Sequence, residues 1–145
     1  MYTLTYESKA AMDLTPDQME ELLISARSKN TRLGITGCLI FYNGAFIQVI
    51  EGNRSDVMAL FEKIKEDERH TEVHLFSDDE IKERTFSDWG MAYYPLDKNK
   101  ASQNELEQFK KNLFLLADLS NPKNITAVLF WKRMKFMISS PSNET

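Results

Sequence analysis

The chain has 145 residues, of which 42% are hydrophobic and 28% are charged. These proportions are typical of a folded globular protein and exclude a chain that is disordered throughout. The formal net charge of −4 lacks the basic excess of a general nucleic-acid binder, so no nucleic-acid partner is expected.

The chain opens with a predicted strand that leads into a helix. Tyr2, Leu4 and Tyr6 alternate with threonines, which indicates a strand with one buried face. Thr15 then begins a capping-box pattern, and the proline that follows it suits the first position of a helix. We therefore expect a helix over residues 16–29.

The middle of the chain predicts a β-hairpin, a second helix and two further strands. Asn43-Gly44 is the strongest hairpin signal, because a type I′ turn needs a positive φ at both residues. Either Asn53 or Ser55 caps the helix, whose apolar residues form one stripe. The strands of this part are expected over residues 38–42, 45–50, 72–84 (with a break near 78–79) and 91–94. The order β-α-β-β-α-β-β predicts an α+β, ferredoxin-like sandwich with two helices on one face of a mixed sheet.

The rest of the chain predicts a helical extension. The sequence turns polar and loses its periodicity at residues 96–101, so we expect a domain over residues 1–95 and an extension over residues 96–145. One helix is predicted soon after the polar stretch. A second is predicted over residues 125–138, although residues 126–131 are also compatible with a strand.

Cysteine usage and the absence of long apolar stretches bear on location. Cys38 is the only cysteine, so neither an intramolecular disulfide nor a multi-cysteine zinc site can form. The first residues do not form a signal-peptide pattern. No apolar stretch approaches the roughly 18 residues of a membrane span. These features predict a cytoplasmic location and no membrane partner.

Gln48 is the most informative single residue of the chain. It lies within an apolar predicted strand and shares a face with Phe46 and Ile50. A primary amide buried there needs polar partners, since an unpaired one costs about 1–3 kcal/mol, and Tyr6 is a candidate. A purely structural Gln–Tyr hydrogen bond and an exposed sheet face are the alternative interpretations.

Asn30 and the end of the second predicted helix offer further polar groups. Asn30 either caps the first helix in the left-handed conformation or offers its amide to the edge of a heterocyclic ring. The residues from Lys63 to His70 form either a solvated helix end or a polar rim for a sugar chain or phosphate. No metal site is predicted, because a turn is expected between His70 and His74. No nucleophile elbow, P-loop or dinucleotide glycine fingerprint is present.

Several of these residues, taken in order, resemble the BLUF family of blue-light sensors that bind a flavin. The matching pieces are Tyr6 with Ser8, Asn30 with residues 34–37, and residues 46–52, 67–70 and 84–91. Their order and spacing over residues 1–95 carry the resemblance. It implies a flavin between the two helices, usually FAD, with FMN or riboflavin also possible.

The resemblance also implies roles for individual residues. Tyr6 and Gln48 would form the photoactive pair, in which Tyr6 gives an electron and a proton that soon return. Gln48 would then be left rotated or tautomerised, and Asn30 would hydrogen-bond the pyrimidine edge of the flavin. The residues implied to contact the flavin are Tyr6, Leu22, Asn30, Gln48, Lys63, Ile64, Asp67 and Arg69.

Signal output is implied to follow the last strand and the helical extension. Trp89 and Met91 occupy positions that relay the signal in the family, although both also suit ordinary core residues. The extension is too short for a catalytic domain, so we expect a non-enzymatic protein that contacts a downstream protein partner and forms homo-oligomers. Without the resemblance, the fold also suits a small-molecule-binding regulatory module or an acylphosphatase-like enzyme.

Overall fold

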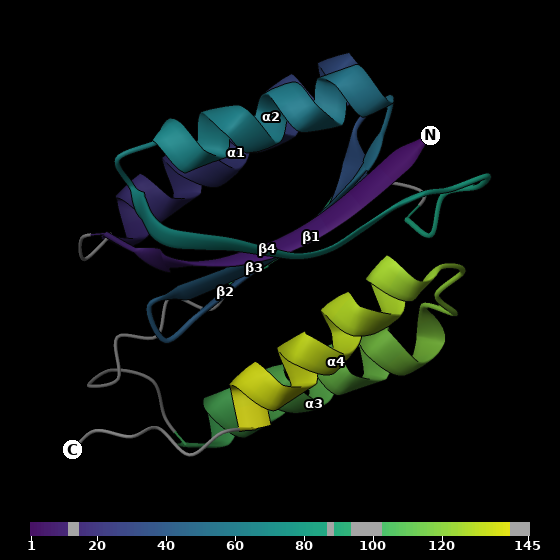
Figure 1. Ribbon diagram of the computed structural model, residues 1–145. Helices are drawn as coiled ribbons and strands as arrows, with labels where there is room; N and C mark the ends of the chain where they lie inside the picture. The colour runs from purple at the N-terminus through teal and green to yellow at the C-terminus, as the bar shows by residue number, and fades with distance from the viewer. Residues whose placement is uncertain (12–14, 87–88, 94–102, 140–145) are drawn as a thin grey trace.

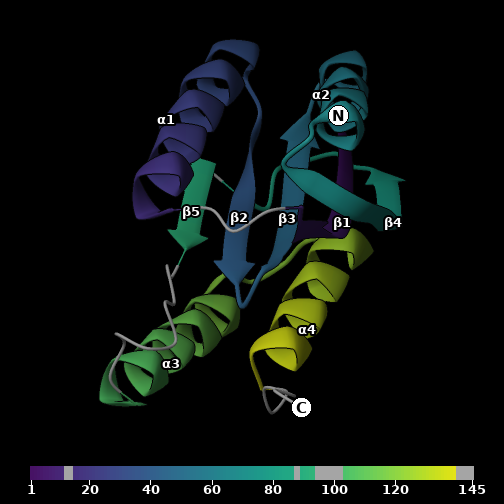
Figure 2. The same cartoon turned by 90° about the vertical axis from the view of Figure 1, so that its left-hand side faces the viewer.

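A computed structural model describes residues 1–11, 15–86, 89–93 and 103–139 of the chain. The elements in chain order are β1 (Tyr2–Ala10), α1 (Pro16–Leu33), β2 (Thr36–Tyr42), β3 (Ala45–Gly52), α2 (Arg54–Glu66), β4 (His70–Glu80), β5 (Trp89–Tyr93), α3 (Gln103–Leu119) and α4 (Ile125–Ser139). The strands form one sheet in the order β4-β1-β3-β2-β5 (Figure 2). Helices α1 and α2 cover one face of this sheet, and α3 and α4 cover the other (Figure 1).

The strand pairing confirms the predicted α+β, ferredoxin-like fold. β1 pairs antiparallel with β3 and β4, β2 pairs antiparallel with β3, and β5 is parallel to β2. Asn43 and Gly44 have φ values of 53° and 79°, so the tight turn predicted between β2 and β3 is confirmed. The capping box predicted at Thr15 is also present.

The structure corrects several predicted element bounds, among them the end of β4, which lies at Glu80 and not at residue 84, and it decides one alternative. α1 continues to Leu33, because the residue that ends it in the left-handed conformation is Gly34, with a φ of 69°. β4 begins at His70 and continues through the break expected at residues 78–79, since pairing with β1 extends to its end. Residues 126–131 lie within α4, so their interpretation as a strand is wrong.

Two hydrophobic cores lie on the two faces of the sheet. The core under α1 and α2 includes the strand residues Leu4, Tyr6, Leu39, Phe46 and Ile50. The core under α3 and α4 includes Cys38, Ile40, Ile47, Val49, Phe130, Trp131 and Met134. Neighbouring residues of β2 and β3 thus alternate between the two cores.

The predicted boundary between the domain over residues 1–95 and the extension lies outside the described residues. The structure does not describe residues 96–101, where the sequence placed this boundary. The division into residues 1–95 and 96–145 therefore stays a prediction. In the part of the chain that the structure describes, no helix combines the length and apolar character needed to cross a membrane.

Candidate functional site

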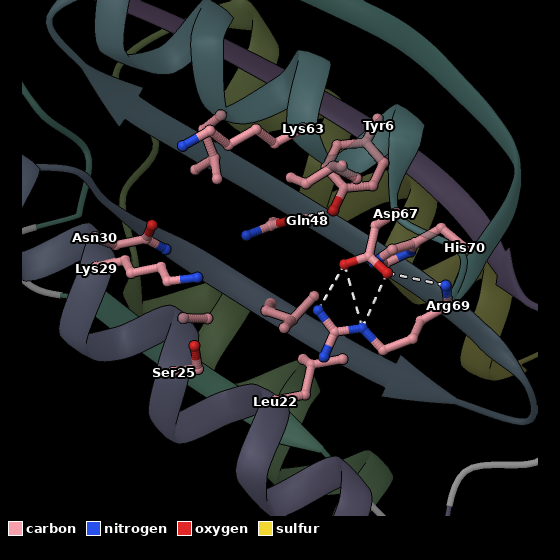
Figure 3. A pocket seen from close by; sticks show the side chains of 14 residues that line it. Tyr6, Leu22, Ser25, Lys29, Asn30, Gln48, Lys63, Asp67, Arg69 and His70 are labelled. Carbon is pink, nitrogen blue, oxygen red and sulfur yellow. Dashed lines mark hydrogen bonds and ion pairs between the residues drawn. The ribbon is translucent and has the colours of Figure 1, made fainter.

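A pocket lies between α1 and α2 and is closed below by the sheet (Figure 3). Its walls come from both helices, from β1, β2 and β3, from the segment that joins α2 to β4, and from the first residue of β4. All eight residues implied to contact a flavin line this one pocket: Tyr6, Leu22, Asn30, Gln48, Lys63, Ile64, Asp67 and Arg69. The fold therefore brings together side chains that are up to 63 residues apart in the sequence.

Tyr6 and Gln48 form a buried hydrogen-bonded pair on the floor of the pocket. They are direct partners in the β1–β3 register, and their exposed fractions are 1% and 4%. The Tyr6 hydroxyl donates to Oε1 of Gln48. Figure 3 shows the amide nitrogen of Gln48 pointing away from Tyr6, toward the side of the pocket where Asn30 lies. The interpretation of this sheet face as exposed is therefore wrong.

Burial controls the protonation of Tyr6. The pKa of its phenol is raised well above the ordinary value of 10.0, mainly by desolvation and further by the negative charge of Asp67. The ring of Phe61 lies 5.5 Å from that of Tyr6, between ring centroids. Tyr6 is therefore held in an apolar environment with its proton directed at Gln48.

Asn30 places an unpaired polar atom inside the protein. Its exposed fraction is 1%, and its Oδ1 has no hydrogen-bond partner among the described residues. An unpaired buried acceptor costs about 1–3 kcal/mol, which indicates a donor from a bound molecule. The alternative role of Asn30 as the helix cap is wrong, because Gly34 occupies the left-handed cap position.

Charged residues form a rim on the α2 side of the pocket. The Asp67 carboxylate accepts from the guanidinium of Arg69, with Nη2 at 2.5 Å and Nε at 3.0 Å. This hydrogen bond from Arg69 lowers the pKa of Asp67 to about 2. Lys63 lines the same rim. These charged groups line the pocket, and their role in holding a sugar chain or phosphate stays a prediction.

His70 attaches the end of this rim to β1. Its Nδ1 lies 2.9 Å from Oγ of Ser8, and its ring centroid lies 6.5 Å from that of Tyr6. Burial lowers the pKa of His70. His70 and His74 both lie in β4, and within the described residues no three or more His, Cys, Asp or Glu side chains gather as they would around a metal.

Six more residues line the pocket beyond the eight that the resemblance implied, namely Ser25, Ala26, Lys29, Leu39, Leu60 and His70. Ser25, Ala26 and Lys29 follow Leu22 on α1 at helical spacing, so the periodicity of the sequence contained the signal for them. Leu39 pairs with Gln48 across the hairpin, and that register follows from the predicted turn.

Trp89 and Met91 belong to β5, where their backbones pair with Gly37 and Leu39 of β2. Their side chains lie outside the described residues.

The family model described as "BLUF: Sensors of blue-light using FAD" matches residues 1–92. With this match, the pocket and its Tyr–Gln pair define a flavin-dependent sensor of blue light. The chain belongs to the BLUF family. The BLUF domain is a sensor domain rather than a catalytic one, which decides against the acylphosphatase-like interpretation.

Curated relatives and solved structures agree with this assignment. Photoactivated adenylate cyclase subunit beta of Euglena longa is 35% identical over 91 residues, which cover 62% of this chain and 11% of that subunit. The chain thus spans about a tenth of the length of such relatives. BlrB, a BLUF protein solved in its dark state, is 32% identical, with a TM-score of 0.65 over 94% of this chain and 96% of BlrB. BlrP1 of Klebsiella pneumoniae, solved with manganese and cyclic diGMP, is 31% identical, with a TM-score of 0.67 over 96% of this chain and 33% of BlrP1.

Proposed function

We propose that the pocket holds the ring system of FAD between Leu22 of α1 and Ile64 of α2. The observation that carries this proposal is the unpaired Oδ1 of Asn30, because the pyrimidine edge of a flavin presents an N–H donor flanked by carbonyl acceptors. The Asn30 amide matches that edge with one acceptor and one donor. The cations of Lys63 and Arg69 on the rim suit the phosphate end of the molecule.

We further propose that Tyr6 and Gln48 form the light switch. When bound, a flavin would supply the group that absorbs blue light and, in its excited state, an oxidant for a neighbouring donor. Tyr6 is a phenol with its proton already directed at Gln48, so it is suited to give an electron and to pass that proton to the amide, and to take both back afterwards. Gln48 presents its acceptor to Tyr6 and its donor to the pocket, and rotation or tautomerisation of the amide changes this pattern. The changed hydrogen-bond pattern is itself the signal.

The proposal is tested by the colour and photochemistry of the purified protein. We expect non-covalently bound oxidised flavin that denaturation releases, and a reversible red shift in blue light without net bleaching. Mass spectrometry of the released molecule distinguishes FAD from FMN and riboflavin. Persistent bleaching by a flavin–thiol adduct would contradict the mechanism. Cys38 is unsuited to one, because it lies in the core under α3 and α4 and burial raises the pKa of its thiol to about 12.

Asn30→Leu is expected to separate flavin binding from folding. Leucine has the same branching and the same number of side-chain heavy atoms and removes a buried unpaired oxygen, so the free energy of unfolding of the flavin-free protein should not fall. The dissociation constant for flavin should rise by about tenfold to a hundredfold, equivalent to roughly 1.4–2.8 kcal/mol. Fluorescence titration and urea unfolding measure the two quantities. Thr31→Ala, at an exposed neighbouring position, is the matched control, and equal flavin affinities in the two variants would count against the role of Asn30.

We propose that output passes to a protein partner through the C-terminal helices. Trp89 and Met91 are proposed relay residues, and residues 96–145 are proposed to serve as an output or oligomerisation extension. The relatives that are cyclase subunits indicate that BLUF domains act on other protein modules. We also propose a homo-oligomeric state, which size-exclusion chromatography tests. We propose a cytoplasmic location, which cell fractionation tests.

A further inference from the structure

Glu51 of β3 is a buried carboxylate that the light switch does not use. Its exposed fraction is 0%, and it lies three residues beyond Gln48 on the same strand. The Thr36 hydroxyl donates to it at 3.0 Å, and the main-chain N–H groups of Thr85 and Phe86 donate at 3.0 and 2.6 Å. Burial raises the pKa of Glu51, whereas these donors act in the opposite direction. Three directional bonds to one buried carboxylate fix the positions of the groups that donate them.

Arg84 adds a second attachment at the same place. Its Nη1 donates to the Thr36 hydroxyl at 2.8 Å and to the main-chain oxygen of Glu51 at 3.2 Å. Residues 84–86 belong to neither a helix nor a strand, so contacts of this kind determine where they lie. Residues 84–86 are thereby attached to β2 and β3.

The same short segment also packs against α4. The ring of Phe86 lies 6.3 Å from that of Phe130 and 6.0 Å from that of Trp131, between ring centroids. Phe130 and Trp131 are 0% and 4% exposed, so these rings meet inside the core. Phe86 therefore donates its amide to Glu51 while its side chain contacts the middle of α4.

Thr85 makes a parallel connection to the start of α4. Its hydroxyl accepts from the main-chain N–H of Lys123 at 3.3 Å and from Nδ2 of Asn124 at 3.2 Å. Oδ1 of Asn124 in turn accepts from the main-chain N–H of Ala127 at 2.9 Å and caps the helix. The two residues held by Glu51 thus contact both the beginning and the middle of α4.

The remaining described polar contacts between the sheet and α4 involve other strands. Glu7 of β1 accepts two bonds from Arg133, at 2.6 and 2.8 Å, and the Arg133 side chain is 43% exposed. Asp79 of β4 accepts from the Thr126 hydroxyl at 2.5 Å. Among the hydrogen bonds of the described residues, β3 is therefore linked to α4 through Glu51 and residues 84–86.

We propose that Glu51 is the positioning residue that couples the strand of Gln48 to α4. Resting on the proposed light switch, this coupling converts a shift of β3 into a shift of α4 through Thr85 and Phe86. Apolar side chains between β3 and α4 can slide, whereas hydrogen bonds to a carboxylate transmit displacement in a fixed direction. The route lies in residues 84–86 and requires no particular arrangement of the side chains of β5.

Glu51→Gln and Glu7→Gln test the coupling as a matched pair in the full flavin-loaded chain. Both remove one negative charge at constant size, but only the first replaces an acceptor of the Glu51 network with an N–H₂ group. In the dark, the amides of Thr85 and Phe86 should exchange hydrogen faster in Glu51→Gln than in wild type or Glu7→Gln. In blue light, the spectral shift should persist in both variants. The light-induced change in exchange over residues 123–139 should fall about threefold or more in Glu51→Gln alone.

Phe86→Leu covers the case in which Glu51→Gln does not fold. It keeps the main-chain donors to Glu51 and removes the ring contacts with α4, so it should also reduce the light-induced change over residues 123–139. Full retention of that change in Glu51→Gln or Phe86→Leu would overturn the coupling, as would its loss in Glu7→Gln alone. A wild-type spectral shift without any change over residues 123–139 would overturn the coupling and leave the light switch intact. A wild type without a spectral shift would overturn the light switch itself.

Discussion

Tyr6→Phe and Gln48→Leu are each expected to yield a protein that binds flavin but forms no red-shifted state in blue light. Both substitutions keep the volume and most of the packing of the pocket floor, so flavin affinity should stay within about tenfold of wild type. Phenylalanine lacks the hydroxyl that donates to Gln48, and leucine lacks the amide that rearranges. Light–dark difference spectra at saturating flavin measure the outcome.

Thr5→Val is the control for these two variants. The Thr5 hydroxyl donates to the main-chain oxygen of Gln48 at 2.8 Å, from the residue next to Tyr6. Valine removes one hydroxyl from the strand that carries Tyr6, and with it one hydrogen bond to Gln48. The free energy of unfolding should fall by about 1 kcal/mol, but the Gln48 side chain keeps its own hydrogen bond. The red shift should persist in Thr5→Val. A normal red shift in Gln48→Leu would contradict the proposed switch.

Gly37→Ala is expected to prevent the protein from folding. Gly37 has a φ of 152°, and a Cβ atom added there would lie 2.0 Å from the main-chain oxygen of Val49. The atom in the way is backbone in the centre of the sheet, so relief would require β2 and β3 to separate. A loss above about 4 kcal/mol is expected, which is comparable to the whole stability of a marginal domain. Urea unfolding, or the absence of soluble protein, measures it.

Gly34→Ala provides the comparison for this effect. Gly34 also has a positive φ, 69°, but a Cβ atom there would meet nothing within 4 Å. The substitution should therefore cost only about 1–2 kcal/mol, the strain of a left-handed alanine. Similar losses for Gly34→Ala and Gly37→Ala would show that the close approach of Gly37 to Val49 is not what requires glycine.

Local signals were sufficient to predict most of the fold. Asn43-Gly44 predicted the hairpin and, through it, the register that places Leu39 beside Gln48. The end of α1 was misplaced, because Asn30 and Gly34 both tolerate the left-handed conformation and the sequence pattern does not rank them in context. In the structure Gly34 ends the helix, and this leaves the Asn30 side chain free to enter the pocket.

The proposed coupling residue, Glu51, escaped prediction because its environment depends on long-range contacts. Glu51 lies beside a glycine at a strand end, where a carboxylate is usually solvated. Its burial follows from Thr85 and Phe86, which lie 34 and 35 positions further along the chain. Their main-chain N–H groups donate to the Glu51 carboxylate. Main-chain donors leave no trace in residue identity, so a sequence pattern cannot reveal them.

The raised pKa of Tyr6 keeps its phenol protonated in alkaline surroundings. An ordinary tyrosine ionises near pH 10, but the Tyr6 phenol keeps its proton well beyond that point because it is buried beside Asp67. A rise of pH through the usual range of tyrosine ionisation therefore leaves the donor to Gln48 in place. The hydroxyl on which the proposed switch depends is thus available in a single protonation state across that range.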